Sequence, residues 1–172
     1  RMDSPIEIQN AAEADDVPEP PELGAWAEAA LAAVERPGVA ITVRIVDAGE
    51  GRALNRDFRG RDYATNVLSF PFPELPPEAM AELGGRYIGD LAICADVVTR
   101  EAREQGKTVR AHWAHLIVHG VLHLVGYDHQ DDDEAERMEA RECAILADLG
   151  FPDPYSTDPN AADLNSTNSE TS

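Results

Sequence analysis

The order of hydrophobic and polar residues along the chain predicts four strands and five helices. Strands are indicated where β-branched and other apolar residues alternate with polar ones, and helices where apolar residues recur three and four positions apart. The predicted strands cover residues 5–9, 39–46, 65–70 and 87–94. The predicted helices cover residues 23–34, 53–58, 96–105, 108–125 and 131–149.

Turn-forming residues separate these segments. Pro37 and Gly38 follow the first predicted helix, prolines are frequent over residues 71–77, and Gly126 and Gly150 follow the last two helices. From Pro152 onward the chain is rich in Ser, Asn, Thr and Asp, which is typical of disorder. A length of 172 residues suits one domain with a real core. We therefore expect a single domain over residues 1–155 and a disordered acidic and polar tail over residues 156–172.

The net charge of −19 is unevenly distributed. Residues 1–35 carry −8 and residues 111–172 carry −11, whereas residues 36–110 are neutral overall. Nucleic-acid binding depends on Lys and Arg side chains that displace counterions from phosphates. Only the middle section, where Arg52, Arg56, Arg59 and Arg61 are closely spaced, offers a surface for a polyanion. The acidic ends are expected to favour solubility.

Composition also argues against several classes of protein. No apolar run approaches the ~20 residues that span a bilayer, so no membrane partner is expected. Residues 1–10 lack the apolar core of a signal peptide, and we expect a cytoplasmic protein. Cys94 and Cys143 are too few and too far apart for a disulfide framework or a Cys-rich zinc site, so both are expected to be buried free thiols.

Candidate chemistry is concentrated in the segment His119-Gly-Val-Leu-His123-Leu-Val-Gly126-Tyr-Asp-His129. Residues four apart on a helix differ by ~40° in direction and ~6 Å in height, so His119 and His123 can reach one ion. Gly126 can adopt a backbone conformation closed to other residues, which would let the chain turn and return His129 to the same ion. Three protein ligands with an open fourth position are typical of a catalytic zinc site. The segment predicts one Zn²⁺ ion held by His119, His123 and His129.

Other polar residues near this segment have simpler interpretations. His112 and His115 lie on a neighbouring stripe of the same apolar helix, where buried histidines need only hydrogen-bond partners. Support of the metal ligands is their functional alternative. Asp128 is a weak candidate for orienting a ligand imidazole, because an acid in a turn more often caps the next helix or is solvated.

The histidine spacing is shared with metzincin metalloproteases, which are the alternative class of enzyme. In those proteases the first His is followed by a Glu that acts as the general base. This chain has Gly120 at that position, which can neither accept nor donate a side-chain proton. Met138 lies downstream of the histidines, as the turn methionine of those proteases does, but its helical surroundings favour a packing residue.

Four motifs, in this order, resemble those of the YbeY endoribonucleases, also called ribosomal RNA maturation factors. They are Leu54-Asn-Arg-Asp-Phe-Arg59, Thr65-Asn-Val-Leu-Ser-Phe-Pro71, Gly89-Asp-Leu-Ala-Ile93 and the three-histidine segment. The motifs span most of residues 39–145. Residues 10–21 and those after Tyr155 carry no family signal.

The resemblance implies an α+β fold in which a small mixed four-stranded sheet packs against about five helices. It implies a zinc-dependent endoribonuclease specific for single-stranded RNA, acting in ribosomal RNA (16S 3′ end) maturation and ribosome quality control. It also implies a catalytic role for Arg59, whose planar guanidinium can hold two phosphate oxygens. Activated water and the RNA 2′-hydroxyl both remain candidate nucleophiles.

A third hypothesis is a ribosome assembly factor in which the metal only stabilises the fold. The expected partners are single-stranded ribosomal RNA and the ribosome or a ribosomal protein, and no DNA partner is expected. The acidic helix over residues 131–149 is a candidate docking surface for such a partner, with a solvated surface as the ordinary alternative.

Overall fold

A computed structural model describes residues 6–12, 14, 16–36, 38–71, 78, 87–127 and 131–155. These residues form four strands and five helices. The strands are β1 (Ile6–Asn10), β2 (Ala40–Val46), β3 (Val67–Pro71) and β4 (Tyr87–Cys94). The helices are α1 (Pro20–Ala33), α2 (Ala48–Arg59), α4 (Ala95–Gln105), α5 (Val109–Leu124) and α6 (Asp132–Leu149). The prediction of an α+β fold with four strands and five helices is confirmed.

The strands form one mixed sheet in the order β1-β2-β4-β3. β1 pairs with β2 and β2 with β4 in parallel, whereas β3 runs antiparallel to β4. β1 and β3 are therefore the two edges of the sheet. The edge strand β3 matters for the site, because it lies beside α5.

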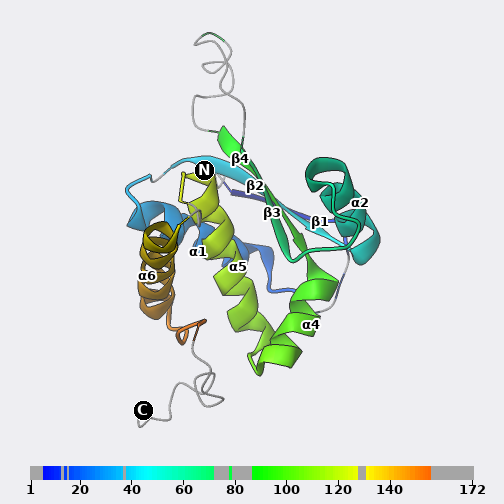
Figure 1. Cartoon of the computed structure of the whole chain (residues 1–172). Helices are drawn as coiled ribbons and strands as arrows, with labels where there is room; N and C mark the ends of the chain where they lie inside the picture. The colour runs from blue at the N-terminus through cyan, green and yellow to red at the C-terminus, as the bar shows by residue number, and fades with distance from the viewer. Residues whose placement is uncertain are drawn as a thin grey trace.

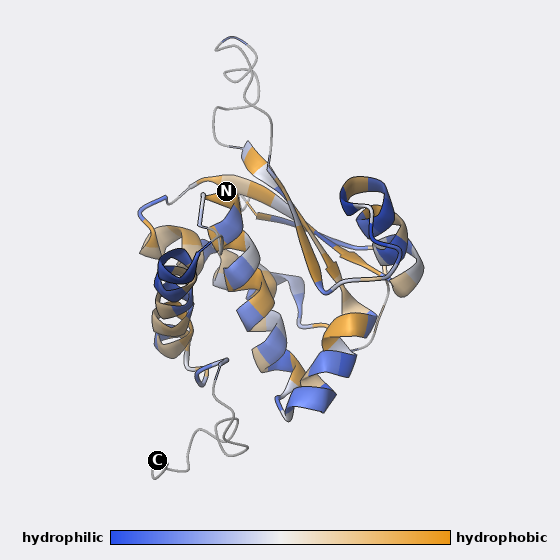
Figure 2. Ribbon diagram, in the orientation of Figure 1, coloured by the Kyte–Doolittle hydropathy of each residue, from blue (hydrophilic) through white to orange (hydrophobic). Residues whose placement is uncertain are grey.

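Helices cover the two faces of the sheet unequally (Figure 1). α1, α5 and α6 lie together on one face, where the largest apolar cluster includes Leu31, Ile45, Trp113 and Ile117. α2 lies on the opposite face and carries mainly hydrophilic residues (Figure 2). α5 is thus held between the sheet and two helices, which gives its side chains fixed positions.

Most predicted boundaries are correct to within two residues, but two helices begin earlier than expected. α1 begins at Pro20, three residues before the predicted start. Proline suits the first turn of a helix, because the N–H that it lacks has no partner there. α2 begins at Ala48 rather than at residue 53. Its N-cap is Asp47, whose carboxylate accepts a hydrogen bond from the Glu50 N–H at 2.8 Å.

Two smaller expectations have different outcomes. Cys94 is buried as predicted, but Cys143 is only half-buried, because it faces the segment after α6 and its thiol donates to Asp153 at 3.3 Å. Met138 is fully buried in the core, in agreement with a packing role.

In the described part of the chain no helix is long and apolar enough to cross a membrane. The predicted tail, residues 156–172, lies outside the described residues.

Candidate metal centre and cleft

α5 carries four histidines in different surroundings. Thr108 caps the helix by accepting a hydrogen bond from the Ala111 N–H, and Gly126 has the positive φ of 112° that was expected after its end. His112 and His115 are buried, whereas His119 and His123 are partly exposed. The rings of His119 and His123 have centroids 4.7 Å apart and are nearly perpendicular. Two imidazoles one turn apart are therefore close enough to share an ion.

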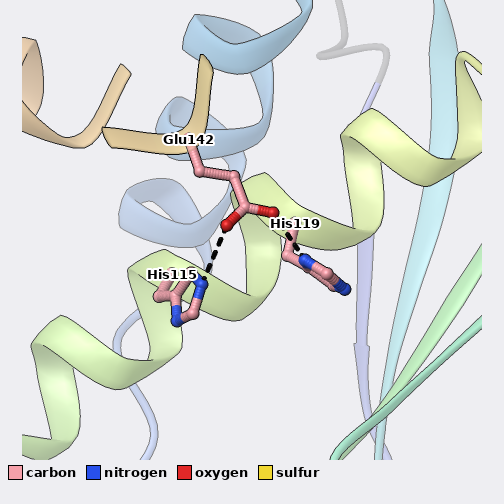
Figure 3. Close-up of side chains that lie close together, drawn as sticks. All are labelled: His115, His119 and Glu142. Atoms are coloured by element: carbon pink, nitrogen blue, oxygen red, sulfur yellow. Dashed lines mark hydrogen bonds and ion pairs between the residues drawn. The ribbon is translucent and has the colours of Figure 1, made fainter. Parts of the chain in front are cut away.

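A buried carboxylate from α6 joins the histidines (Figure 3). Glu142 has no exposed surface. One of its oxygens lies 2.5 Å from His119 Nδ1, and the other lies 3.1 Å from His115 Nε2. The Tyr155 hydroxyl also donates to Glu142. Two helices and the segment after α6 therefore meet at one carboxylate.

The hydrogen bonds to Glu142 fix its charge. Burial would raise the pKa of this carboxyl group, but the hydrogen bonds from His115 and His119 lower it to about 2. An ionised carboxylate can only accept, so His119 carries its proton on Nδ1. In this tautomer of the neutral ring the lone pair is on Nε2, the ring nitrogen that points away from Glu142 in Figure 3. A carboxylate that orients a metal-binding imidazole in this way is a common arrangement.

His115, His119 and Glu142 form a group that could hold a metal ion, with ligand atoms within 4.8 Å of one another. However, His115 Nε2 and one carboxylate oxygen of Glu142 are already hydrogen-bonded together. An ion at this point would have to replace those bonds in a buried place. The chemistry of the donors therefore fits a metal better on the Nε2 side of His119, where His123 also lies.

A cleft of about 470 Å³ lies on that side. His119 and His123 form one wall, and Arg59, at the end of α2, lines the same cleft. Arg59 is exposed, and no described carboxylate lies within salt-bridge distance of it. By contrast, Arg52 makes two hydrogen bonds with Asp62. The cleft thus combines imidazoles with an arginine whose charge is not offset by a neighbouring acid.

The open edge of β3 and the two residues before it form the rest of the cleft wall, from Thr65 to Ser69. The Cys94 N–H donates to the Asn66 carbonyl at 2.9 Å, so even-numbered residues of β3 direct their backbone polar groups toward β4. Ser69 therefore directs its N–H and C=O outward. Its cross-strand partner is the core residue Leu91, so its side chain lies on the α5 face. A bound chain could accept hydrogen bonds from this edge.

Gly120 lies against the sheet. A Cβ atom built at this position would come within 2.7 Å of Leu91 Cδ2. Any side chain at position 120 would therefore require the fully buried Leu91 side chain to move. A glutamate acting as the general base of a metzincin protease would displace this core side chain, which is a structural reason to disfavour that alternative.

The sequence predictions for the site are met unevenly. His119, His123 and Arg59 line one cleft, while His129 and Asp128 lie outside the described residues. His112 and His115 are buried and hydrogen-bonded, to Glu101 and Glu142 respectively. Glu142 was missed because it belongs to an acidic helix. It follows the buried Met138 by four positions, and this charge on the apolar face was the available signal.

Together these features define an α+β protein with a histidine-rich candidate metal centre beside an arginine-lined cleft. Residues 7–150 match the family described as Endoribonuclease YbeY. The chain belongs to this family.

Individual relatives agree with this assignment. The Endoribonuclease YbeY of Halorhodospira halophila is 60% identical over 138 residues, which cover 80% of this chain and 88% of that protein. The one from Pseudomonas putida is 52% identical over 155 residues, which cover 90% and 95% of the two chains. The solution structure of TM1509 from Thermotoga maritima has the same fold, with a TM-score of 0.52 and 24% identity over 88% of this chain and 99% of that chain.

Proposed function

We propose that this protein is a zinc-dependent endoribonuclease that cleaves single-stranded ribosomal RNA in the cytoplasm, in 16S 3′ end maturation and ribosome quality control. Its relatives carry the name Endoribonuclease YbeY, which supports cleavage at internal bonds of an RNA strand. The observation that carries the proposal is that Arg59, His119 and His123 line the same cleft. At such a cleft a bound metal ion would polarise the phosphodiester, and the guanidinium would offset its negative charge.

The metal ligands in this proposal are His119, His123 and His129. When bound, the zinc ion would supply a Lewis acid that polarises a phosphodiester oxygen. Glu142 would hold His119 in the tautomer that a metal requires, because it accepts the proton on Nδ1. Zinc is favoured by an all-imidazole set with one open position. Metal analysis of the protein purified without added metal tests the identity of the ion.

Arg59 would stabilise the transition state. Phosphoryl transfer adds negative charge to the oxygens around phosphorus, and a guanidinium can bind two of them with fixed geometry. Ser69 would help to position the RNA strand, because its backbone N–H and its hydroxyl face the cleft. The described lining of the cleft contains no carboxylate that could deprotonate a nucleophile. A 2′,3′-cyclic phosphate on the product would identify the RNA 2′-hydroxyl as the nucleophile.

Replacing Arg59 tests this proposal and separates an enzyme from a ribosome assembly factor without catalysis. We expect Arg59→Ala to fold normally and to cleave single-stranded RNA ~10²- to 10³-fold more slowly, the usual effect of losing one transition-state donor. Arg56→Ala is the matched control, since Arg56 is on the same helix, is exposed and already faces Asp57. Equal cleavage by Arg59→Ala and Arg56→Ala would remove Arg59 from the mechanism.

A further inference from the structure

A second cavity opens beside the cleft. Its volume is about 300 Å³, and it shares Asn66 and His119 with the cleft as lining residues. α4, α5 and the segment around Pro154 form the rest of its wall. A nucleic-acid strand held at His119 would therefore have an adjacent nucleotide at this cavity. Its size is at the lower end of the ~300–1,000 Å³ typical of small-molecule sites, which suits one base.

Two groups of opposite charge line this cavity. Lys107 is half-buried, and its ammonium donates to the Pro154 carbonyl at 2.8 Å. An ammonium has three N–H donors, so this bond leaves two. Burial lowers the pKa of Lys107, and the nearby negative charge of Glu101 opposes this shift. Lys107 and Glu101 are thus close enough for their charges to interact.

Glu101 is held rigidly with part of its hydrogen-bonding capacity left over. Its Oε1 accepts from Asn66 Nδ2 at 3.0 Å and lies 2.9 Å from His112 Nε2. Its Oε2 has no hydrogen-bond partner among the described residues. The cavity therefore offers donors on Lys107 and an acceptor on Glu101, and the neighbours that hold both groups also line it.

For a base that enters the cavity in one orientation, a donor on one side and an acceptor on the other favour some bases over others. Guanine and uracil each have a keto oxygen next to a ring N–H, which would face Lys107 and Glu101 respectively. Adenine and cytosine present an amino group next to an unprotonated ring nitrogen, which reverses the pattern. Guanine also has an amino group that can donate to the same carboxylate, and lysine commonly pairs with guanine oxygens.

We propose that this cavity binds the base of a nucleotide adjacent to the scissile bond, with guanine preferred and uracil second. The proposal rests on the proposed function only in that the ligand is single-stranded RNA. Lys107 and Glu101 are specificity-determining residues in this view, and neither takes part in the chemical step. Asn66 connects the two regions, since it lines both cavities and donates to Glu101.

Binding of short oligoribonucleotides tests the proposal without any need for cleavage. The probes are five-nucleotide RNAs with adenosine at the four outer positions and adenine, guanine, hypoxanthine or 2-aminopurine as the central base. Fluorescence anisotropy measures the affinity of each. We expect guanine to bind about tenfold or more tightly than adenine. Hypoxanthine keeps the keto oxygen and ring N–H and should retain most of this preference, whereas 2-aminopurine lacks both and should lose it.

The variant Lys107→Met should abolish the preference for guanine, while the binding of the adenine pentamer changes little. Arg103→Met is the charge-matched control, because Arg103 is exposed on α4 and does not line the cavity. Equal binding of all four probes, or a guanine preference that survives in Lys107→Met, would overturn the proposal. Thermal unfolding of both variants checks that the fold is intact. Guanine preference without any RNA cleavage would support this cavity and refute the endoribonuclease activity.

Discussion

The histidines of α5 differ in the partner that each one meets. His112 faces Glu101, and His115 and His119 share Glu142. Burial lowers the pKa of His115 although Glu142 opposes this shift, so this imidazole is held neutral inside the protein. His119 is also bound to Glu142, but it is partly exposed and lines the cleft. Glu142 is therefore hydrogen-bonded both to a structural histidine, His115, and to a candidate metal ligand, His119.

Replacing His123 tests the proposed ligand set. We expect His123→Ala to purify with little metal, because three imidazoles binding one ion act as a unit. His112→Ala should keep its metal, since His112 faces Glu101 instead of the cleft. Elemental analysis of both proteins gives the measurement. Near-stoichiometric metal in His123→Ala together with its loss from His115→Ala would move the site to His115, His119 and Glu142.

At the scale of elements, α6 delivers a charge to a place where helices usually present apolar residues. Met138, Ile145 and Leu146 share the buried face with Glu142. Burying an isolated carboxylate is costly, and three hydrogen-bond donors at this position offset that cost. The packing of α6 against α5 is thus coupled to the orientation of His119.

Glu142→Gln should weaken metal binding without removing a ligand. The neutral amide cannot hold His119 as a carboxylate does, and loss of such a supporting group typically costs ~10–100-fold in metal affinity. Glu136→Gln, an exposed change on the same helix, is the control. Competition with a zinc chelator measures both affinities. Equal affinity in the two variants would show that His119 needs no support from α6.

The contact between α5 and β4 can be tested through Gly120. A methyl group at this position would collide with Leu91, and overpacking of a core typically costs ~1–3 kcal/mol. We expect Gly120→Ala to unfold at lower denaturant concentration and to bind metal less well, because His119 and His123 would shift with the helix. Gly24→Ala is the matched control, since the nearest atom to a Cβ at that buried helical glycine is 3.9 Å away. If Gly120→Ala is as stable as Gly24→Ala, the close approach of α5 to β4 has no energetic importance.

The elements were predictable where a local signal determines them. β4 and α5 follow clear patterns of apolar residues, and Thr108 and Gly126 mark the ends of α5. The early start of α2 was missed although Asp47 and Glu50 have the spacing of a capping box. Glu101 and Tyr155 could not be assigned to the site, because their roles depend on contacts between segments far apart in the sequence. Glu142 had a local signal, a charge on an apolar helical face, but its partners on α5 could not be predicted for the same reason.

At the scale of the whole molecule, positive charge is scarcer than the sequence indicated. Four arginines between positions 52 and 61 were expected to form the phosphate-binding surface. Arg52 is paired with Asp62, and Arg56 lies 3.3 Å from Asp57. Arg59 and Arg61 have no such acidic partner among the described residues. The proposed RNA-binding surface therefore has little positive charge, and the chain as a whole carries a net charge of −19.

This scarcity predicts a shallow dependence of RNA binding on salt. Single-stranded RNA releases ~0.7 counterions for each phosphate that is neutralised, so about two free arginines give a slope of about −1.4 for log K against log salt. Four contacts, one for each arginine between positions 52 and 61, would give a slope twice as steep. Titration of a short single-stranded RNA over a salt series measures the slope. A slope as steep as that of a strongly basic protein would show that RNA binds elsewhere on the molecule. A slope near −1.4 with tight ribosome association would instead require a partner protein to supply the missing contacts.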